Sequence, residues 1–82
     1  MNIYVSNLGF NVDRDELKKI FSPYGIVASV SIILDKLTNR SRGFAFVQMS
    51  DPSAAEKAMR ELNGVMLDGR AIRMNEAKRN ER

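Results

Sequence analysis

The spacing of apolar residues changes in a fixed order along the chain, and this order most constrains its fold. Alternation with a period of two is typical of a half-buried strand, and apolar residues three and four apart are typical of an amphipathic helix. The order strand, helix, strand, strand, helix, strand is carried by residues 2–7, 11–25, 26–34, 42–49, 51–64 and 70–75. Two helices therefore have to pack with four strands.

Both predicted helices carry end signals. Asp13 and Glu16 form a capping-box pattern at the start of the first helix. Asp51 followed by Pro52 is typical of a helix start, because the carboxylate caps free N–H groups and proline fits the first helical position. Gly64 is the kind of residue that ends a helix. These signals support the two helical segments independently of their apolar spacing.

The order of elements predicts one α+β domain over residues 1–77, followed by a short basic tail at 78–82. Right-handed crossovers place both helices on one face of a four-stranded antiparallel sheet, with the first and third strands side by side at its centre. This arrangement is the ferredoxin-like βαββαβ sandwich. Asn39 suits a left-handed turn between the middle strands, and Asp68 with Gly69 predicts a hairpin-type turn. The other face of the sheet has no helix to cover it.

The segment RGFAFVQM, residues 42–49, places large apolar side chains on both faces of its predicted strand. Successive residues of a strand point to opposite faces, so Phe44 and Phe46 point away from Ala45. Tyr4 is predicted to share the face of these two rings. The residues predicted to face the helices are Ile3, Val5, Val30, Ile32, Ala45, Val47, Met49, Ile72 and Met74.

Composition removes several classes of function. The chain has no cysteine and no histidine, which excludes disulfides, the commonest metal ligands and the familiar nucleophilic triads. We therefore expect a protein without catalytic residues, metal or cofactor. The sequence shows no charged-then-apolar leader and no apolar run near the roughly 20 residues that cross a bilayer. We expect a cytoplasmic protein that begins at Met1 and does not enter a membrane.

Three aromatic rings on an uncovered sheet face predict a binding surface, because large exposed apolar patches usually mark interaction sites. Stacking a nucleobase on an aromatic side chain contributes about 1–3 kcal/mol. The 13 Lys and Arg residues outnumber the 10 Asp and Glu residues, which gives a net charge of +3 and a mild preference for polyanions. We thus predict a platform for single-stranded nucleic acid. A dimer or a terminal extension that buries the rings is the alternative.

Two short segments resemble the signatures of the RNA recognition motif, or RRM, family. IYVSNL, residues 3–8, is similar to the shorter signature. Residues 42–49 resemble the longer one, which begins with Lys or Arg, Gly, an aromatic residue, Gly or Ala, Phe and Val. The likeness runs from Asn2 to about Ala77. It departs at Met49, where relatives usually have an aromatic residue, but this position is predicted to point inward.

The resemblance implies a role in binding single-stranded RNA for each matching position. Tyr4 and Phe44 would each stack on a base, Phe46 would lie against sugar rings or between nucleotides, and Arg42 would pair with a phosphate. Contacts with base edges are implied for Asn75, Ala77 and Lys78. Secondary contacts are implied for Gln48, Arg73 and Arg79.

The brevity of the chain, its start at the first strand and its short basic tail are similar to the stand-alone single-RRM proteins of bacteria. We expect a monomer that acts as a post-transcriptional regulator or an RNA chaperone. Single-stranded DNA is an alternative partner. An RRM-like protein-interaction module is a rival, although such variants often lose the stacking aromatics that this chain keeps. A more distant rival is an acylphosphatase-like enzyme, which shares the topology. Its glycine-rich loop with a nearby Arg is absent from SNLGFNVDRDEL, residues 6–17.

Overall fold

The computed structural model describes residues 1–39 and 41–77, with the backbone alone at residues 41 and 42. The main sheet is formed by β1 (Asn2–Ser6), β2 (Val27–Leu34), β3 (Ser41–Met49) and β6 (Arg73–Ala77). The helices are α1 (Arg14–Phe21), which continues into a short 3₁₀ turn (Ser22–Tyr24), and α2 (Pro52–Leu62). A two-stranded hairpin of β4 (Met66–Leu67) and β5 (Arg70–Ala71) precedes β6.

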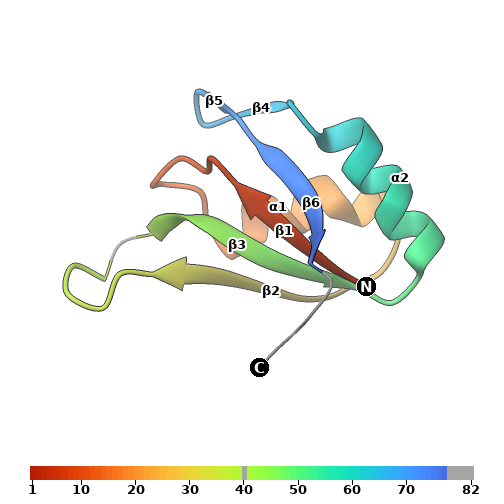
Figure 1. Cartoon of the computed structure of the whole chain (residues 1–82), viewed down its shortest axis with the longest axis horizontal. Coiled ribbons are helices and arrows are strands. Elements are labelled where there is room, and N and C mark those ends of the chain that lie inside the picture. Colours follow the sequence, from red (N-terminus) through yellow and green to blue (C-terminus); the bar gives the residue numbers. More distant parts are fainter. Residues whose placement is uncertain (40, 78–82) are drawn as a thin grey trace.

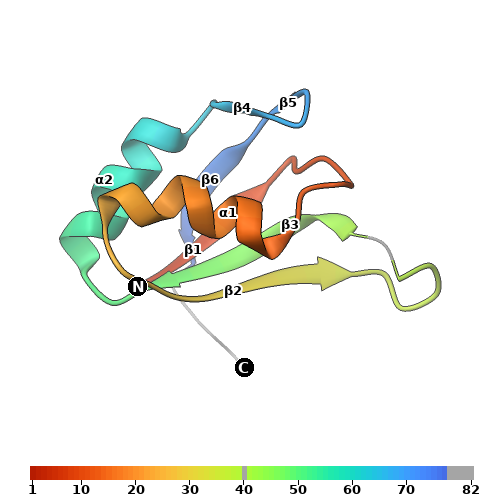
Figure 2. The same cartoon turned by 180° about the vertical axis from the view of Figure 1, so that it is seen from behind.

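The four strands of the main sheet are antiparallel and lie in the order β2-β3-β1-β6. Both helices lie on one side of the sheet, so Figure 1 shows the strands in front of α1 and Figure 2 shows α1 in front of the strands. The ferredoxin-like fold predicted from the sequence is thereby confirmed, with β1 and β3 at the centre. Within the described residues, no helix lies on the face seen in Figure 1, which we call the open face.

Local hydrogen bonds explain where the helices begin. Asp13 Oδ1 accepts a 2.9 Å bond from the Glu16 backbone N–H, and the Asp13 N–H donates to Glu16 Oε1 at 3.2 Å. The predicted capping box is therefore present. In α2, Asp51 Oδ1 accepts from the Ser53 N–H at 2.9 Å, with Pro52 in the first turn. Within the described residues, neither helix is long and apolar enough to cross a membrane.

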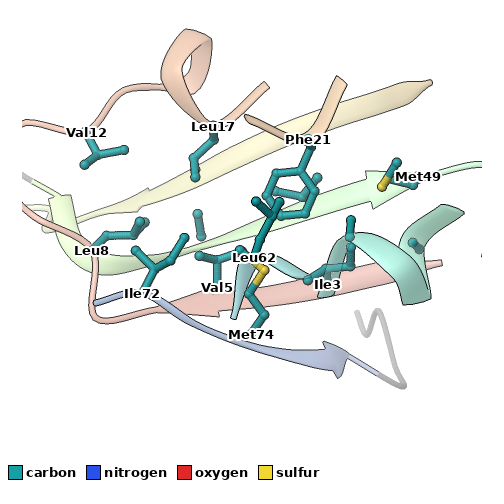
Figure 3. Packing of buried hydrophobic residues seen from close by; sticks show 14 residues of the cluster. Ile3, Val5, Leu8, Val12, Leu17, Phe21, Met49, Leu62, Ile72 and Met74 are labelled. Carbon is teal, nitrogen blue, oxygen red and sulfur yellow. The ribbon is translucent and has the colours of Figure 1, made fainter. Parts of the chain in front are cut away.

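The core lies between the sheet and the two helices. Figure 3 shows Leu17 and Phe21 of α1 pointing toward the strand residues Ile3 and Val5. All four of these side chains have no exposed surface. Met49 is also fully buried, which confirms that its departure from the RRM pattern concerns the core. Both helices pack against this side of the sheet, so among the described residues no helix covers the opposite side.

The segment predicted as one strand over residues 70–75 is divided in the structure. Its first two residues form β5, which pairs with β4, and the rest belongs to β6, which pairs with β1. The break falls at Ile72, whose N–H donates to Val65 O at 3.0 Å while its side chain stays in the core. The predicted turn at Asp68 and Gly69 joins β4 to β5, and both residues have positive φ, 54° and 80°.

Candidate nucleic-acid interface

The candidate site is a set of cross-strand rows on the open face. The central row contains Ser31, Phe46, Tyr4 and Asn75, because Phe46 lies opposite both Ser31 and Tyr4, and Tyr4 lies opposite Asn75. Neighbouring strands are about 4.8 Å apart and residues two apart on a strand are about 7 Å apart. Side chains of this row are therefore immediate neighbours.

Two further rows border the central one. On one side, Gln48 lies opposite Ser29 and Asn2, and Asn2 lies opposite Ala77. Ser29 Oγ donates to Gln48 Oε1 at 3.2 Å, and this bond holds the Gln48 side chain next to the central row.

The third row carries the remaining ring and a cation. Ser6 lies opposite Phe44 on one strand and opposite Arg73 on the other. Arg73 is exposed. On β6 the neighbouring acidic residue, Glu76, lies opposite the core residue Ile3, and alternation therefore turns it away from the open face. The described side chains of the three rows include no acidic group, so the surface favours an anionic ligand.

The three rings form a contiguous aromatic cluster. The ring centroids of Tyr4 and Phe46 are 5.5 Å apart, with 50° between the ring planes. Those of Tyr4 and Phe44 are 5.8 Å apart, with 45° between the planes. Phe46 is 37% exposed, and Tyr4 and Phe44 are half-buried. Tyr4 therefore contacts both phenylalanine rings, and neither contact is a parallel stack.

The structure brings together most of the residues predicted to bind. Tyr4, Phe44, Phe46, Gln48, Arg73, Asn75 and Ala77 all occupy the three rows. Arg42 lies in β3, one residue before Gly43, and its side chain is outside the description. Lys78 and Arg79 lie outside the described residues. The predicted neighbourhood of rings and polar groups is therefore present for every position whose side chain is described.

Sequence reasoning missed a second aromatic position at one end of the sheet. Phe10, in the loop between β1 and α1, is 63% exposed. The Arg70 guanidinium carbon lies 5.7 Å from the centroid of its ring, and Arg70 Nη1 donates to Asn7 Oδ1 at 3.2 Å. The available signal was an aromatic residue in a polar loop directly after the first signature, but nothing in the spacing paired it with Arg70.

Sequence comparison matches the chain to the RNA recognition motif and to proteins named as RNA-binding. The family model for the RNA recognition motif matches residues 3–73. RNA-binding protein CP29B of Arabidopsis thaliana chloroplasts is 48% identical over 92% of this chain. The chain spans between 26% and 34% of the length of that protein and two similar chloroplast ribonucleoproteins. RbpE of Nostoc sp. is 42% identical, and the match covers 99% of this chain and 82% of that protein.

Solved structures agree in fold over nearly the whole chain. The crystal structure of RNA binding protein PG1 superposes with a TM-score of 0.94 at 40% identity, covering 100% of this chain and 99% of that one. The second RRM domain of the yeast poly(U)-binding protein Pub1 superposes with a TM-score of 0.86 at 33% identity, covering 99% and 98%.

Proposed function

Because the chain belongs to the RNA recognition motif family, we propose that it binds single-stranded RNA on the open face of its sheet. The observation that carries this proposal is the contiguous cluster of Tyr4, Phe44 and Phe46 on a face that no described helix covers. Family members stack two or three bases on aromatic residues of this sheet. The names of CP29B and PG1 as RNA-binding proteins support the same ligand class.

The positions of the rings in the three rows suggest how the bases are shared among them. Tyr4 and Phe46 lie side by side in the central row, whereas Phe44 lies in the third row, at the border of the cluster. We therefore assign base stacking to Tyr4 and Phe46. Phe44 would then contact sugar rings. This division reverses the two phenylalanine roles that the sequence resemblance implied, and single alanine variants distinguish the two assignments.

The polar groups around the rings would supply base-edge and phosphate contacts. Asn75 and Gln48 carry amide groups next to the rings, and the backbone of Ala77 borders them. Arg73 would pair with a phosphate. The same role is proposed for Arg42, Lys78 and Arg79 from the family resemblance alone. Contacts of this kind make the affinity decrease with salt.

The direct test is a titration of fluorescently labelled uridine hexamer with the protein, because Pub1 is named as poly(U)-binding. We expect binding that Tyr4→Ala weakens by about 5- to 150-fold, the loss of one stacked base. The control variant is Ile26→Ala, which removes an apolar side chain of 79% exposure outside the three rows. A thymidine hexamer tests whether DNA is accepted. No binding of the wild type to either strand, or equal losses in both variants, contradicts the proposal.

We further propose that the protein acts as a monomer in the cytoplasm, without catalysis, as a regulator of messages or an RNA chaperone. The lack of histidine and cysteine supports the non-catalytic role. Sedimentation with and without RNA tests the monomer, and cell fractionation tests the location. A protein-interaction module is the alternative outcome. It predicts capture of a peptide by the open face together with indifference to RNA.

A further inference from the structure

One end of the sheet carries a pre-assembled cluster that the three rows do not include. Asn7 Nδ2 donates to the backbone O of Ala71 at 2.8 Å, and Asn7 Oδ1 accepts from Arg70 Nη1 at 3.2 Å. The Arg70 guanidinium in turn lies over the ring of Phe10, 5.7 Å from its centroid. Two connections that are far apart in sequence, the β1–α1 loop and the β4–β5 hairpin, thus meet at one point.

This cluster lies next to the third row of the open face. Asn7 directly follows Ser6, which lies between Phe44 and Arg73 in the third row. Figures 1 and 2 both show the β4–β5 hairpin and the β1–α1 loop at the same end of the sheet. Phe10 is four residues beyond Ser6, so the chain places their Cα atoms at most about 14 Å apart. A strand of RNA leaving the third row in this direction meets the cluster next.

The Phe10 ring is available to a ligand. It is the most exposed aromatic side chain of the described residues, at 63%, so it does not serve the core. It also lines an open hollow of about 850 Å³ together with residues 11–14, at the start of α1, and with Val30, Ser31 and Ile32 of β2. Arg70 does not line this hollow, so the hollow shows only that one side of the Phe10 ring is open to a ligand.

Arg70 is held in position before any ligand arrives. Asn7 and the Phe10 ring, both in the β1–α1 loop, each contact its guanidinium, which restricts a side chain that is otherwise flexible. A guanidinium has five N–H donors in a planar fork that matches a phosphate. The bond to Asn7 uses Nη1, so the remaining nitrogens can donate to an anion.

We propose that Phe10 and Arg70 form a further nucleotide subsite, in which a base of the bound RNA stacks on Phe10 and its phosphate accepts hydrogen bonds from Arg70. The proposal rests on the proposed function. It extends the RNA footprint beyond the two or three bases that the sheet itself holds. Any base can stack on an aromatic ring, so the subsite should increase the affinity for longer RNA strands without selecting a particular sequence.

The test compares uridine oligonucleotides of three and six residues, because the shorter strand fills the sheet and the longer one also reaches the subsite. Phe10→Ala is expected to leave trimer affinity within about twofold and to weaken hexamer binding at least about fivefold, the loss of one stacked base. Phe10→Tyr should retain the hexamer affinity. Arg70→Gln should weaken the hexamer selectively and reduce its dependence on salt.

A matched control separates binding from support of the hairpin. Met66 lies in β4, is 64% exposed and pairs with Ala71, so Met66→Ala removes a comparable apolar surface from the same hairpin. It should change neither affinity. In spectra of the wild type, the hexamer but not the trimer should shift the side-chain NH₂ signals of Asn7 and the Nε–H signal of Arg70.

Three results would overturn the subsite formed by Phe10 and Arg70. An unchanged ratio of trimer to hexamer affinity in Phe10→Ala overturns the subsite and leaves the proposed function intact. An equal loss for both oligonucleotides also overturns it, because the cluster then only supports the sheet. If the wild type binds neither strand, the proposed function fails and the subsite fails with it.

Discussion

Removing the Phe46 ring should lower RNA affinity far more than it lowers stability. Phe46 lies at the centre of the open face, opposite Tyr4 and Ser31. Loss of one stacked base costs about 1–3 kcal/mol, which is about 5- to 150-fold in Kd. Phe46→Ala should therefore weaken binding of a uridine hexamer by this factor.

The cost in stability follows from the exposure of the ring. Full burial of a phenylalanine side chain contributes about 1.5–3 kcal/mol. Phe46 is 37% exposed, so only part of that contribution is lost, about 1–2 kcal/mol. A domain of 82 residues is stable by about 4–12 kcal/mol, and the variant should stay folded. Phe21 has no exposed surface and serves for comparison, because its replacement by alanine should lower the free energy of unfolding by about 3–5 kcal/mol.

The assay pairs fluorescence anisotropy with urea unfolding of the same preparations. Phe46→Leu is the matched variant, since it keeps an apolar side chain and removes the π-face. It should lose nearly as much affinity as Phe46→Ala and less stability. A Phe46→Ala protein that is destabilised as much as Phe21→Ala would show that the ring belongs to the core. A fully stable variant with unchanged affinity would show that no base stacks there.

Four further results are expected. Phe44→Ala should weaken hexamer binding less than Phe46→Ala, and the reverse order in the anisotropy titration would return the stacking role to Phe44. Arg73→Gln should make the slope of log K against log salt shallower by about 0.7, one phosphate contact, for every RNA sequence; an unchanged slope removes that contact. Asp13→Ala breaks the capping box and should lower the free energy of unfolding in urea by about 1 kcal/mol without changing RNA affinity; a stability loss well below that figure would show that the cap is not needed. Partial burial, then the hydrogen bond and charge of Glu61, raise the pKa of Tyr24, so its contribution to stability should be present below pH about 10 and decrease as the pH rises through the folded-state pKa. The stability difference between wild type and Tyr24→Phe, measured by urea unfolding, should shrink there, and a difference that grows with pH would contradict the sign.

The sequence was sufficient for the main sheet because several local signals agreed. The spacing of apolar residues changed with each element, and the Asp13 cap marked the start of α1 as the structure has it. Asn39 has a φ of 63°, in the left-handed region that its loop was predicted to need. The turn at residues 68–69 also formed as predicted. Chemistry within a few residues decided each of these features.

The features that were not predicted depend on contacts between distant segments. β4 and β5 contain two residues each, which is too short for alternation to be read. The break at Ile72 leaves its side chain in the core, so the apolar pattern continues across it. Phe10 and Arg70 are brought together only by the folded hairpin.

The most direct test of the account is a map of backbone amide shifts as uridine hexamer is added to the labelled protein. We predict that the largest changes fall on β1 and β3, around Tyr4, Phe44 and Phe46, with smaller ones on β6 and at Phe10. The amide signals of residues on the exposed surfaces of α1 and α2 should not shift. Shifts confined to the helices, or no shifts even at RNA concentrations of several millimolar, would contradict binding on the open face.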